Sequence, residues 1–312
     1  MKRLLTFIKE SLNIFEGGHS IEGAEPIRGD LAKEVADQII SKIKEKFHIE
    51  CAALGSTGKK GKDQTSGDID IAVQMQWEDK DKLIDFVKKE FKDCPFGNIV
   101  DYLNVFNIGY KYEEDGKEKI VQVDFMFVDD VEWAQFVYFS PNFLKNESQF
   151  KGSWRSTLLR GICACTPTEK VNKKYKTEYF DGAKTIKTFW KFTFSQASGL
   201  FADHKTYEGN NGKVLKNPKT IKDDRIYISK NIDEILHICL GNDATRDDCN
   251  SYETLLNFLA SDRYEFKSVE QLEQIKEWLF GNTDLLREAS DEVKKNAEKL
   301  FDKTIKYVKQ NL

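Results

Sequence analysis

The sequence predicts an α+β protein in which a mixed β-sheet with flanking helices precedes a mainly helical second half. Three observations predict this class. Strand-like runs with period-two alternation lie between residues 49 and 128, amphipathic segments of helical period separate them, and helical, aromatic-rich segments dominate after about residue 130. A length of 312 residues with 40% hydrophobic and 32% charged residues suits two globular domains.

Helices and strands alternate in the first half of the chain. A helix is expected at 30–47, with Asp30 as its N-cap and apolar residues recurring every four positions. An Asp115-Gly116 pair between two strand-like runs is typical of a hairpin turn. The remaining elements expected are strands at 49–54 and 68–75, a helix at 79–91, and the hairpin strands at 104–112 and 118–128.

The second half is expected to be mainly helical. A polar segment at 210–224 interrupts it as a surface hairpin or loop, and the last forty residues have the pattern of two amphipathic helices. A domain boundary is expected between residues 140 and 152, which gives domains of 1–145 and 146–312. Helices are expected at 131–139, 153–163, 180–194 and from 231 to the end.

Composition excludes several classes of protein. The net charge of −4 argues against nucleic-acid binding by bulk charge, although local basic patches such as Lys59-Lys60 remain. The six cysteines show no C-x-x-C spacing, so neither a zinc site nor a disulfide framework is expected. No apolar run approaches the ~20 residues that span a bilayer. We therefore expect a cytoplasmic protein without a membrane partner.

The most informative stretch is Gly55-Ser56, followed after eleven residues by Asp68-Ile69-Asp70-Ile71. Side chains alternate along a strand, so Asp68 and Asp70 share one face while the isoleucines share the other. Two adjacent carboxylates repel each other unless a cation lies between them. Divalent metal bound to carboxylate oxygen, with phosphate as its companion, is the usual solution.

A third carboxylate is predicted at Asp124. It lies within an apolar strand, where Val123 and Phe125 face one way and Asp124 faces the other with Gln122. A charge inside so apolar a strand is costly unless it is paired or binds metal. Taken singly, each acidic residue has an ordinary alternative, either a solvated edge strand or an ion pair with lysine.

Taken together, Gly55, Ser56, Asp68, Asp70 and Asp124 make residues 30–130 resemble the DNA polymerase β-like nucleotidyltransferase superfamily. The order of elements agrees with the resemblance: helix, strand, Gly-Ser turn, two-Asp strand, helix, third-Asp strand. The resemblance implies a nucleotidyltransferase-type sheet in domain 1–145. It also implies a helical domain 146–312 that contributes to nucleotide and acceptor binding.

By this resemblance, Asp68 and Asp70 hold two Mg²⁺ ions, for which Mn²⁺ can substitute, and Asp124 binds the ion that activates the attacking hydroxyl. Gly55 and Ser56 would bind the β- and γ-phosphates of an NTP, most simply ATP. The implied reaction transfers NMP from the NTP to a hydroxyl acceptor and releases pyrophosphate. An RNA 3′ end is the favoured acceptor because basic residues flank the catalytic strand.

Five basic residues are secondary candidates for nucleotide binding. Lys59 and Lys60 would contact the triphosphate or an acceptor phosphate, or else form a solvated loop. Arg155 would clamp phosphate, or else form an ion pair on a helix surface. Lys184 and Lys187 are spaced to share a helix face, and the resemblance implies that a basic residue of the helical domain contacts the triphosphate. The aromatic residues at 190, 192, 194 and 201 are expected in the core, with one ring free to stack on the base.

Two alternatives to RNA extension stay open. In the first, the acceptor is a protein side chain or a small molecule, or the product is a short or cyclic oligonucleotide. A protein partner that holds the enzyme in check is a separate possibility. In the second, the chain is a nucleotide- or RNA-binding module without catalysis. The intact set of Asp68, Asp70 and Asp124 argues against the second alternative.

Overall fold

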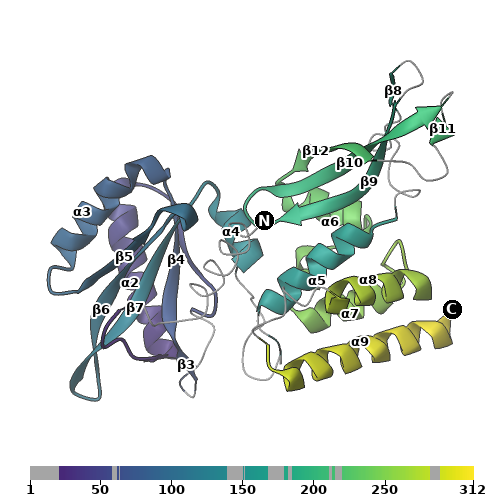
Figure 1. Cartoon of the computed structure of the whole chain (residues 1–312). Helices are drawn as coiled ribbons and strands as arrows, with labels where there is room; N and C mark the ends of the chain where they lie inside the picture. Colours follow the sequence, from purple (N-terminus) through teal and green to yellow (C-terminus); the bar gives the residue numbers. More distant parts are fainter. Residues whose placement is uncertain are drawn as a thin grey trace. The chain divides into compact units, whose positions relative to one another are not determined.

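The computed structural model describes residues 21–57, 62, 64–138, 150, 152–167, 179–181, 185–210, 213–214, 220–281 and 289–312. The chain divides into two compact units, Met1–Gln149 and Phe150–Leu312. Both units are mixtures of helices and strands (Figure 1). None of the helices in the described ranges combines the length and apolarity needed to cross a bilayer.

A five-stranded mixed sheet forms the centre of the first unit. Its order is β2 (Cys51–Leu54), β4 (Asp68–Gln74), β7 (Lys117–Val128), β6 (Val105–Glu114) and β5 (Phe96–Val100). Strands β4 and β7 run parallel, and the other neighbours are antiparallel. The short strands β1 (Ile27–Arg28) and β3 (Thr65–Ser66) form a separate antiparallel pair. The predicted strands are confirmed, whereas β1, β3 and β5 were not predicted.

Helices α2 (Gly29–Phe47) and α3 (Lys80–Glu90) cover one face of this sheet (Figure 1). Helix α2 begins one residue before the predicted start. Asp30 is therefore not its N-cap and instead bonds Arg28 at 2.7 Å. The core below these helices contains Val35, Ile39 and Ile43 of α2, Leu83, Ile84 and Val87 of α3, and Ile69, Ile71, Val73, Val121, Val123, Phe125 and Phe127 of the sheet.

The opposite face of the sheet carries a smaller apolar cluster. Helix α4 (Val131–Tyr138) contributes Ala134 to it, and the sheet contributes Leu54, Ala72, Val105 and Met126. Because strand side chains alternate, Asp68 and Asp70 lie on this same face as Ala72, and Asp124 lies on it with Met126. The acidic residues therefore lie on the face away from α2 and α3.

The second unit contains a five-stranded antiparallel sheet that the sequence analysis did not predict. It consists of β8 (Tyr179–Asp181), β9 (Thr185–Ser195), β10 (Gly199–Asn210), β11 (Lys213–Val214) and β12 (Thr220–Ser229). The helix predicted at 180–194 is therefore wrong. In β9 the buried Phe192 and Phe194 alternate with Lys191 and Thr193, which is the period of a strand.

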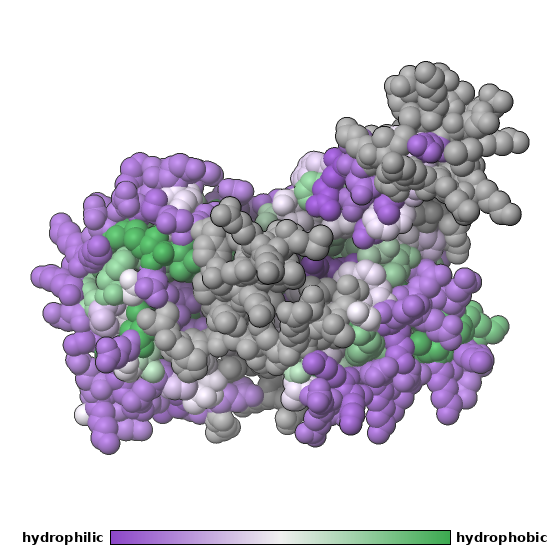
Figure 2. Space-filling view, viewed as in Figure 1, coloured by the Kyte–Doolittle hydropathy of each residue, from purple (hydrophilic) through white to green (hydrophobic). Residues whose placement is uncertain are grey.

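The helices of the second unit are α5 (Gly152–Cys165), α6 (Ile232–Leu240), α7 (Tyr252–Ala260), α8 (Val269–Gly281) and α9 (Asp291–Asn311). Helix α5 contacts β9, α7 and α8, and α9 contacts α7 and α8. The predicted pair of C-terminal amphipathic helices is confirmed as α8 and α9, and hydrophilic side chains cover the outward side of α9 (Figure 2). This unit is thus α+β rather than mainly helical.

Candidate metal centre

Three carboxylates meet on the face of the first sheet that lies away from α2 and α3. Asp68 and Asp70 are two residues apart on β4, and Asp70 lies directly opposite Asp124 in the parallel β4–β7 ladder. One carboxylate oxygen from each residue lies within 4.8 Å of those of the other two. The predicted grouping of these three residues is confirmed, and together they can supply ligands to one metal site.

Burial and mutual repulsion act strongly on this cluster. Burial, followed by the charges of Asp68 and Asp124, raises the pKa of Asp70 well above its ordinary value. Burial raises the pKa of Asp124 to about 7, and the Asp68 charge adds to this shift. The three groups therefore resist being ionised together, and a divalent cation between them removes that cost.

Two amide side chains orient Asp124. The Gln122 side chain donates from Nε2 to Asp124 Oδ1 at 2.8 Å. The Asn107 side chain also hydrogen-bonds the Asp124 carboxylate, and its own Oδ1 accepts the Asn98 backbone N–H at 2.8 Å. Both hydrogen bonds lower the pKa of Asp124 against the larger effect of burial. They favour the ionised, metal-binding form of this residue.

Neither amide is among the predicted site residues, although the sequence holds a signal for each. Gln122 is two residues before Asp124 and so shares its strand face. Asn107 is found by counting back from the Asp115-Gly116 turn, because a two-residue hairpin turn sets every opposite pair. Asp115 and Gly116 both have positive φ, of 53° and 73°, as a type I′ turn requires.

The turn that contains Gly55 is fastened to β4. Gly55 has a φ of 61°, and a Cβ there would lie 2.4 Å from Asp70 Oδ2. The buried Thr57 accepts the Asp70 backbone N–H on Oγ1 at 3.2 Å. The Ser56 and Ser66 hydroxyls are hydrogen-bonded at 2.9 Å. Position 55 thus requires glycine because the Asp70 carboxylate lies against its backbone. Binding of phosphate by Gly55 and Ser56 stays a prediction.

The basic candidates are not part of this described cluster. Lys59, Lys60 and Lys184 lie outside the residues that the structure describes, as does the side chain of Lys187. Lys187 belongs to strand β9, so its predicted helical pairing with Lys184 is wrong. Arg155 of α5 is only 3% exposed, and burial lowers its pKa to about 10. Since its guanidinium is enclosed, neither the surface ion pair nor a ready phosphate contact fits Arg155.

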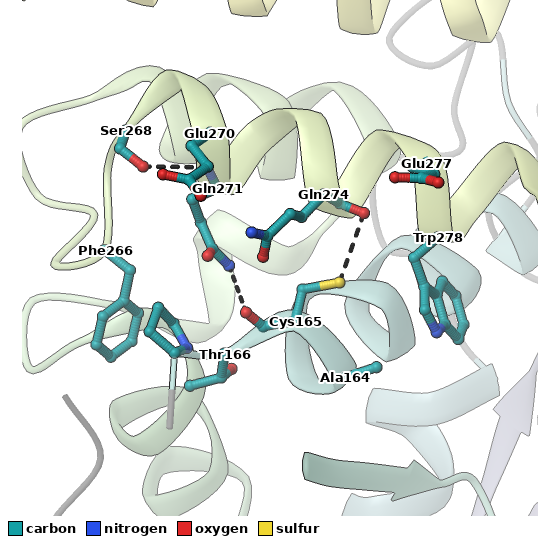
Figure 3. A pocket seen from close by; sticks show the side chains of 11 residues that line it. Ala164, Cys165, Thr166, Phe266, Ser268, Glu270, Gln271, Gln274, Glu277 and Trp278 are labelled. Atoms are coloured by element: carbon teal, nitrogen blue, oxygen red, sulfur yellow. Dashed lines mark hydrogen bonds between the residues drawn. The ribbon is translucent and has the colours of Figure 1, made fainter. Parts of the chain in front are cut away.

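A pocket in the second unit lies between the C-terminal end of α5 and helix α8 (Figure 3). Gln271 donates from Nε2 to the Cys165 carbonyl at 2.7 Å across it, and Cys165 Sγ donates to the Gln274 carbonyl at 3.6 Å. Its described lining includes Glu270 and Glu277 and no lysine, arginine or histidine. A lining of this charge offers no cation to a triphosphate. The three aspartates can supply ligands to a divalent cation, so we assign the candidate site to them.

Comparisons with known proteins add no assignment. No protein-family model matches the chain, and no curated protein matches it. The aspartate cluster and its supporting residues are therefore the features of this chain that point to a function.

Proposed function

We propose that the chain is a metal-dependent nucleotidyltransferase that moves NMP from an NTP to a hydroxyl acceptor and releases pyrophosphate. The observation that carries this proposal is the pairing of Asp70 with Asp124 across parallel strands, with Asp68 on the same face. The order of α2, β2, the Gly55 turn, β4, α3 and β7 supports a nucleotidyltransferase-type fold for the first unit.

The donor set supports a hard divalent cation. All three groups of the cluster are carboxylates, which suit Mg²⁺ and Mn²⁺, whereas zinc sites are usually built with cysteine or histidine. Asp68 and Asp70 would hold the ions shared with the triphosphate, and Asp124 would hold the one beside the acceptor hydroxyl. When bound, such ions stabilise the attacking and leaving oxygens of an in-line displacement at phosphorus.

The protein groups around the cluster would keep it ready for this chemistry. Asn107 and Gln122 hold the Asp124 carboxylate in one orientation and favour its ionised form. Thr57 fixes the backbone at Asp70, and Gly55 leaves room for the Asp70 carboxylate. Preorganisation of this kind is what positions reacting oxygens for phosphoryl chemistry.

The test is transfer of label from each α-labelled NTP, with Mg²⁺ or Mn²⁺, into total RNA, protein extract or small-molecule products. We expect wild-type protein to transfer label, and Asp70→Asn and Asp124→Asn to reduce the rate by about 10³-fold or more. Asp85→Asn, an exposed aspartate on α3, is the matched control and should keep the wild-type rate.

Each outcome of this assay has a distinct meaning. Label in RNA supports extension of an RNA end, and label in protein or small products supports transfer to that other acceptor. Mn²⁺ binding without label in any mixture would overturn transfer in favour of a non-catalytic module. Wild-type rates in Asp70→Asn would overturn the assignment of the cluster.

A further inference from the structure

The outward side of the β9–β10–β12 sheet carries a set of exposed and half-buried aromatic and basic side chains. Lys191, Phe201 and Lys205 alternate along β9 and β10 with the buried Phe192, Leu200 and Ala202. Strand β12 lies at the edge next to β10, while α5 contacts β9 and α6 contacts β12 (Figure 1). We name as the aromatic–basic face the residues Trp190, Lys191, Phe201, Lys205, Arg225 and Tyr227.

A β-bulge brings Trp190 onto this face. Asp203 pairs with Lys191, and the next residue, His204, pairs with Phe189, so Trp190 is the extra residue of β9. Bulges of this kind redirect a side chain. Trp190 is 45% exposed, and the ammonium groups of Lys191 and Lys205 lie 4.2 Å and 3.4 Å from its ring centroid. Both distances are within the range of cation–π contacts.

An aromatic pair lies on β10 and β12 of the same sheet. Phe201 is directly opposite Tyr227, their ring centroids are 5.6 Å apart, and Tyr227 is 55% exposed. The Arg225 guanidinium lies 5.3 Å from the Phe201 ring centroid and bonds Asp203 Oδ1 at 2.8 Å. Arg225 thereby offsets the charge of Asp203, and Asp223 lies opposite Lys205 on the same face. Around Trp190 itself the described charged groups in ring contact are the two lysines.

This combination suits single-stranded nucleic acid better than a protein partner. Unpaired bases stack on exposed aromatic rings, and neighbouring cations bind the phosphates between them. Paired bases in a duplex do not offer their faces. Protein–protein interfaces are enriched in aromatic residues and arginine but depleted in lysine, and Lys191 and Lys205 lie directly beside Trp190.

We propose that the aromatic–basic face binds single-stranded nucleic acid, with bases stacked on Trp190 and on the Phe201–Tyr227 pair. Lys191, Lys205 and Arg225 contact the backbone of the strand. That the bound strand is the acceptor of the nucleotide rests on the proposed function, whereas the binding itself does not.

The test measures fluorescence anisotropy of labelled twelve-nucleotide oligo(U), with oligo(dT) and an RNA duplex as parallel probes, on the full chain. Trp190→Ala and Tyr227→Ala should each weaken oligo(U) binding roughly tenfold, because each removes a stacking surface. Tyr307→Ala is the matched control, since Tyr307 on α9 is 56% exposed and should leave affinity unchanged. Lys205→Gln should reduce the salt dependence of log K by about one unit.

Comparison of the three probes shows which kind of nucleic acid the face binds. Stronger binding of oligo(U) than of oligo(dT) assigns the face to RNA, and equal binding assigns it to either single strand. Equal or stronger binding of the duplex would overturn the proposal, as would wild-type affinity in both aromatic variants. A loss of self-association in these variants, with oligonucleotide affinity unchanged, would overturn it in favour of a second copy of the chain.

The two proposals fail independently in this design. Asp70→Asn should abolish transfer and keep wild-type affinity for oligo(U), because Asp70 belongs to the first unit. Oligo(U) binding that depends on Trp190, with no transfer to any acceptor, would remove only the proposed function. Transfer to RNA with unchanged affinity in Trp190→Ala and Tyr227→Ala would remove only this inference.

Discussion

Asn107 lies directly opposite Asp124 in the β6–β7 hairpin and links its carboxylate to the backbone of β5. The Asn107 amide bonds Asp124, and its Oδ1 accepts the N–H of Asn98. Asn107 is 2% exposed, so water cannot easily replace these bonds. The orientation of the third carboxylate thus depends on a residue from a neighbouring strand.

Asn107→Ala is expected to weaken Mn²⁺ binding about tenfold at pH 7, as loss of an outer-sphere partner does at other metal sites. The hydrogen bond from Asn107 lowers the pKa of Asp124, so its removal raises that pKa further above 7. The midpoint of the pH dependence of Mn²⁺ binding should therefore shift upward in isothermal titration calorimetry. Asn98→Ala, which keeps the backbone N–H and removes only an exposed side chain, is the control. Equal midpoints in Asn107→Ala and wild type would contradict this role.

Stability of the metal-free protein should respond to pH through Asp124. Its pKa is about 7 in the folded chain against an ordinary value of 3.8, so the folded state binds more protons between these values. The contribution of Asp124 to stability is present below pH 4 and is lost as pH rises through 7. Asp124→Asn should therefore gain about 2–3 kcal/mol over wild type on going from pH 5 to pH 8. Urea unfolding with chelator at both pH values measures this gain, and Mn²⁺ should abolish it.

Gly55→Ala should disrupt the metal site beyond its effect on the backbone. Its φ of 61° strains any other residue, and the added Cβ would lie 2.4 Å from Asp70 Oδ2. Gly116→Ala is a matched control, since its φ is 73° and no atom lies within 4 Å of the added Cβ. Both variants should lose about 1 kcal/mol in thermal or urea unfolding. Only Gly55→Ala should lose Mn²⁺ binding, and equal Mn²⁺ affinity in the two variants would refute the steric argument.

Thr57→Val should destabilise the first unit by about 1–3 kcal/mol, because it leaves the Asp70 N–H without its acceptor in a buried site. Thr57→Ser keeps an acceptor oxygen and should retain most of that stability. Urea unfolding curves of the two variants make the comparison. A stability of Thr57→Val equal to that of wild type would show that Oγ1 contributes no net hydrogen bond.

Local patterns were sufficient for most elements of the first unit. Helix α2 was predicted within a residue of its start from the spacing of Val35, Ile39 and Ile43, and the hairpin from Asp115-Gly116. Local patterns were insufficient in the second unit, where the aromatic-rich segment 180–194 was predicted to be a helix. The alternation of Lys191 and Thr193 with Phe192 and Phe194 was the better signal. Strand β5, with no strong alternation of its own, had no usable signal.

In the candidate site, too, some features follow from local sequence patterns and others depend on long-range packing. The period of a strand is enough to show that Asp68 shares a sheet face with Asp70. It shows in the same way that Gln122 shares a face with Asp124. The hairpin register that brings Asn107 opposite Asp124 follows from the two-residue turn. The sequence by itself therefore determined which acidic and amide side chains share a face within each local unit.

Only the tertiary structure decided that β4 lies parallel to β7, with Asp70 opposite Asp124. These strands are separated by α3, β5 and β6, and their register depends on packing of Ile69, Ile71 and Phe125 under α2 and α3. Such long-range pairing has no local signal, because it is selected by burial of the whole sheet. The same holds for Trp190, whose exposure depends on a bulge set by the pairing of β9 with β10.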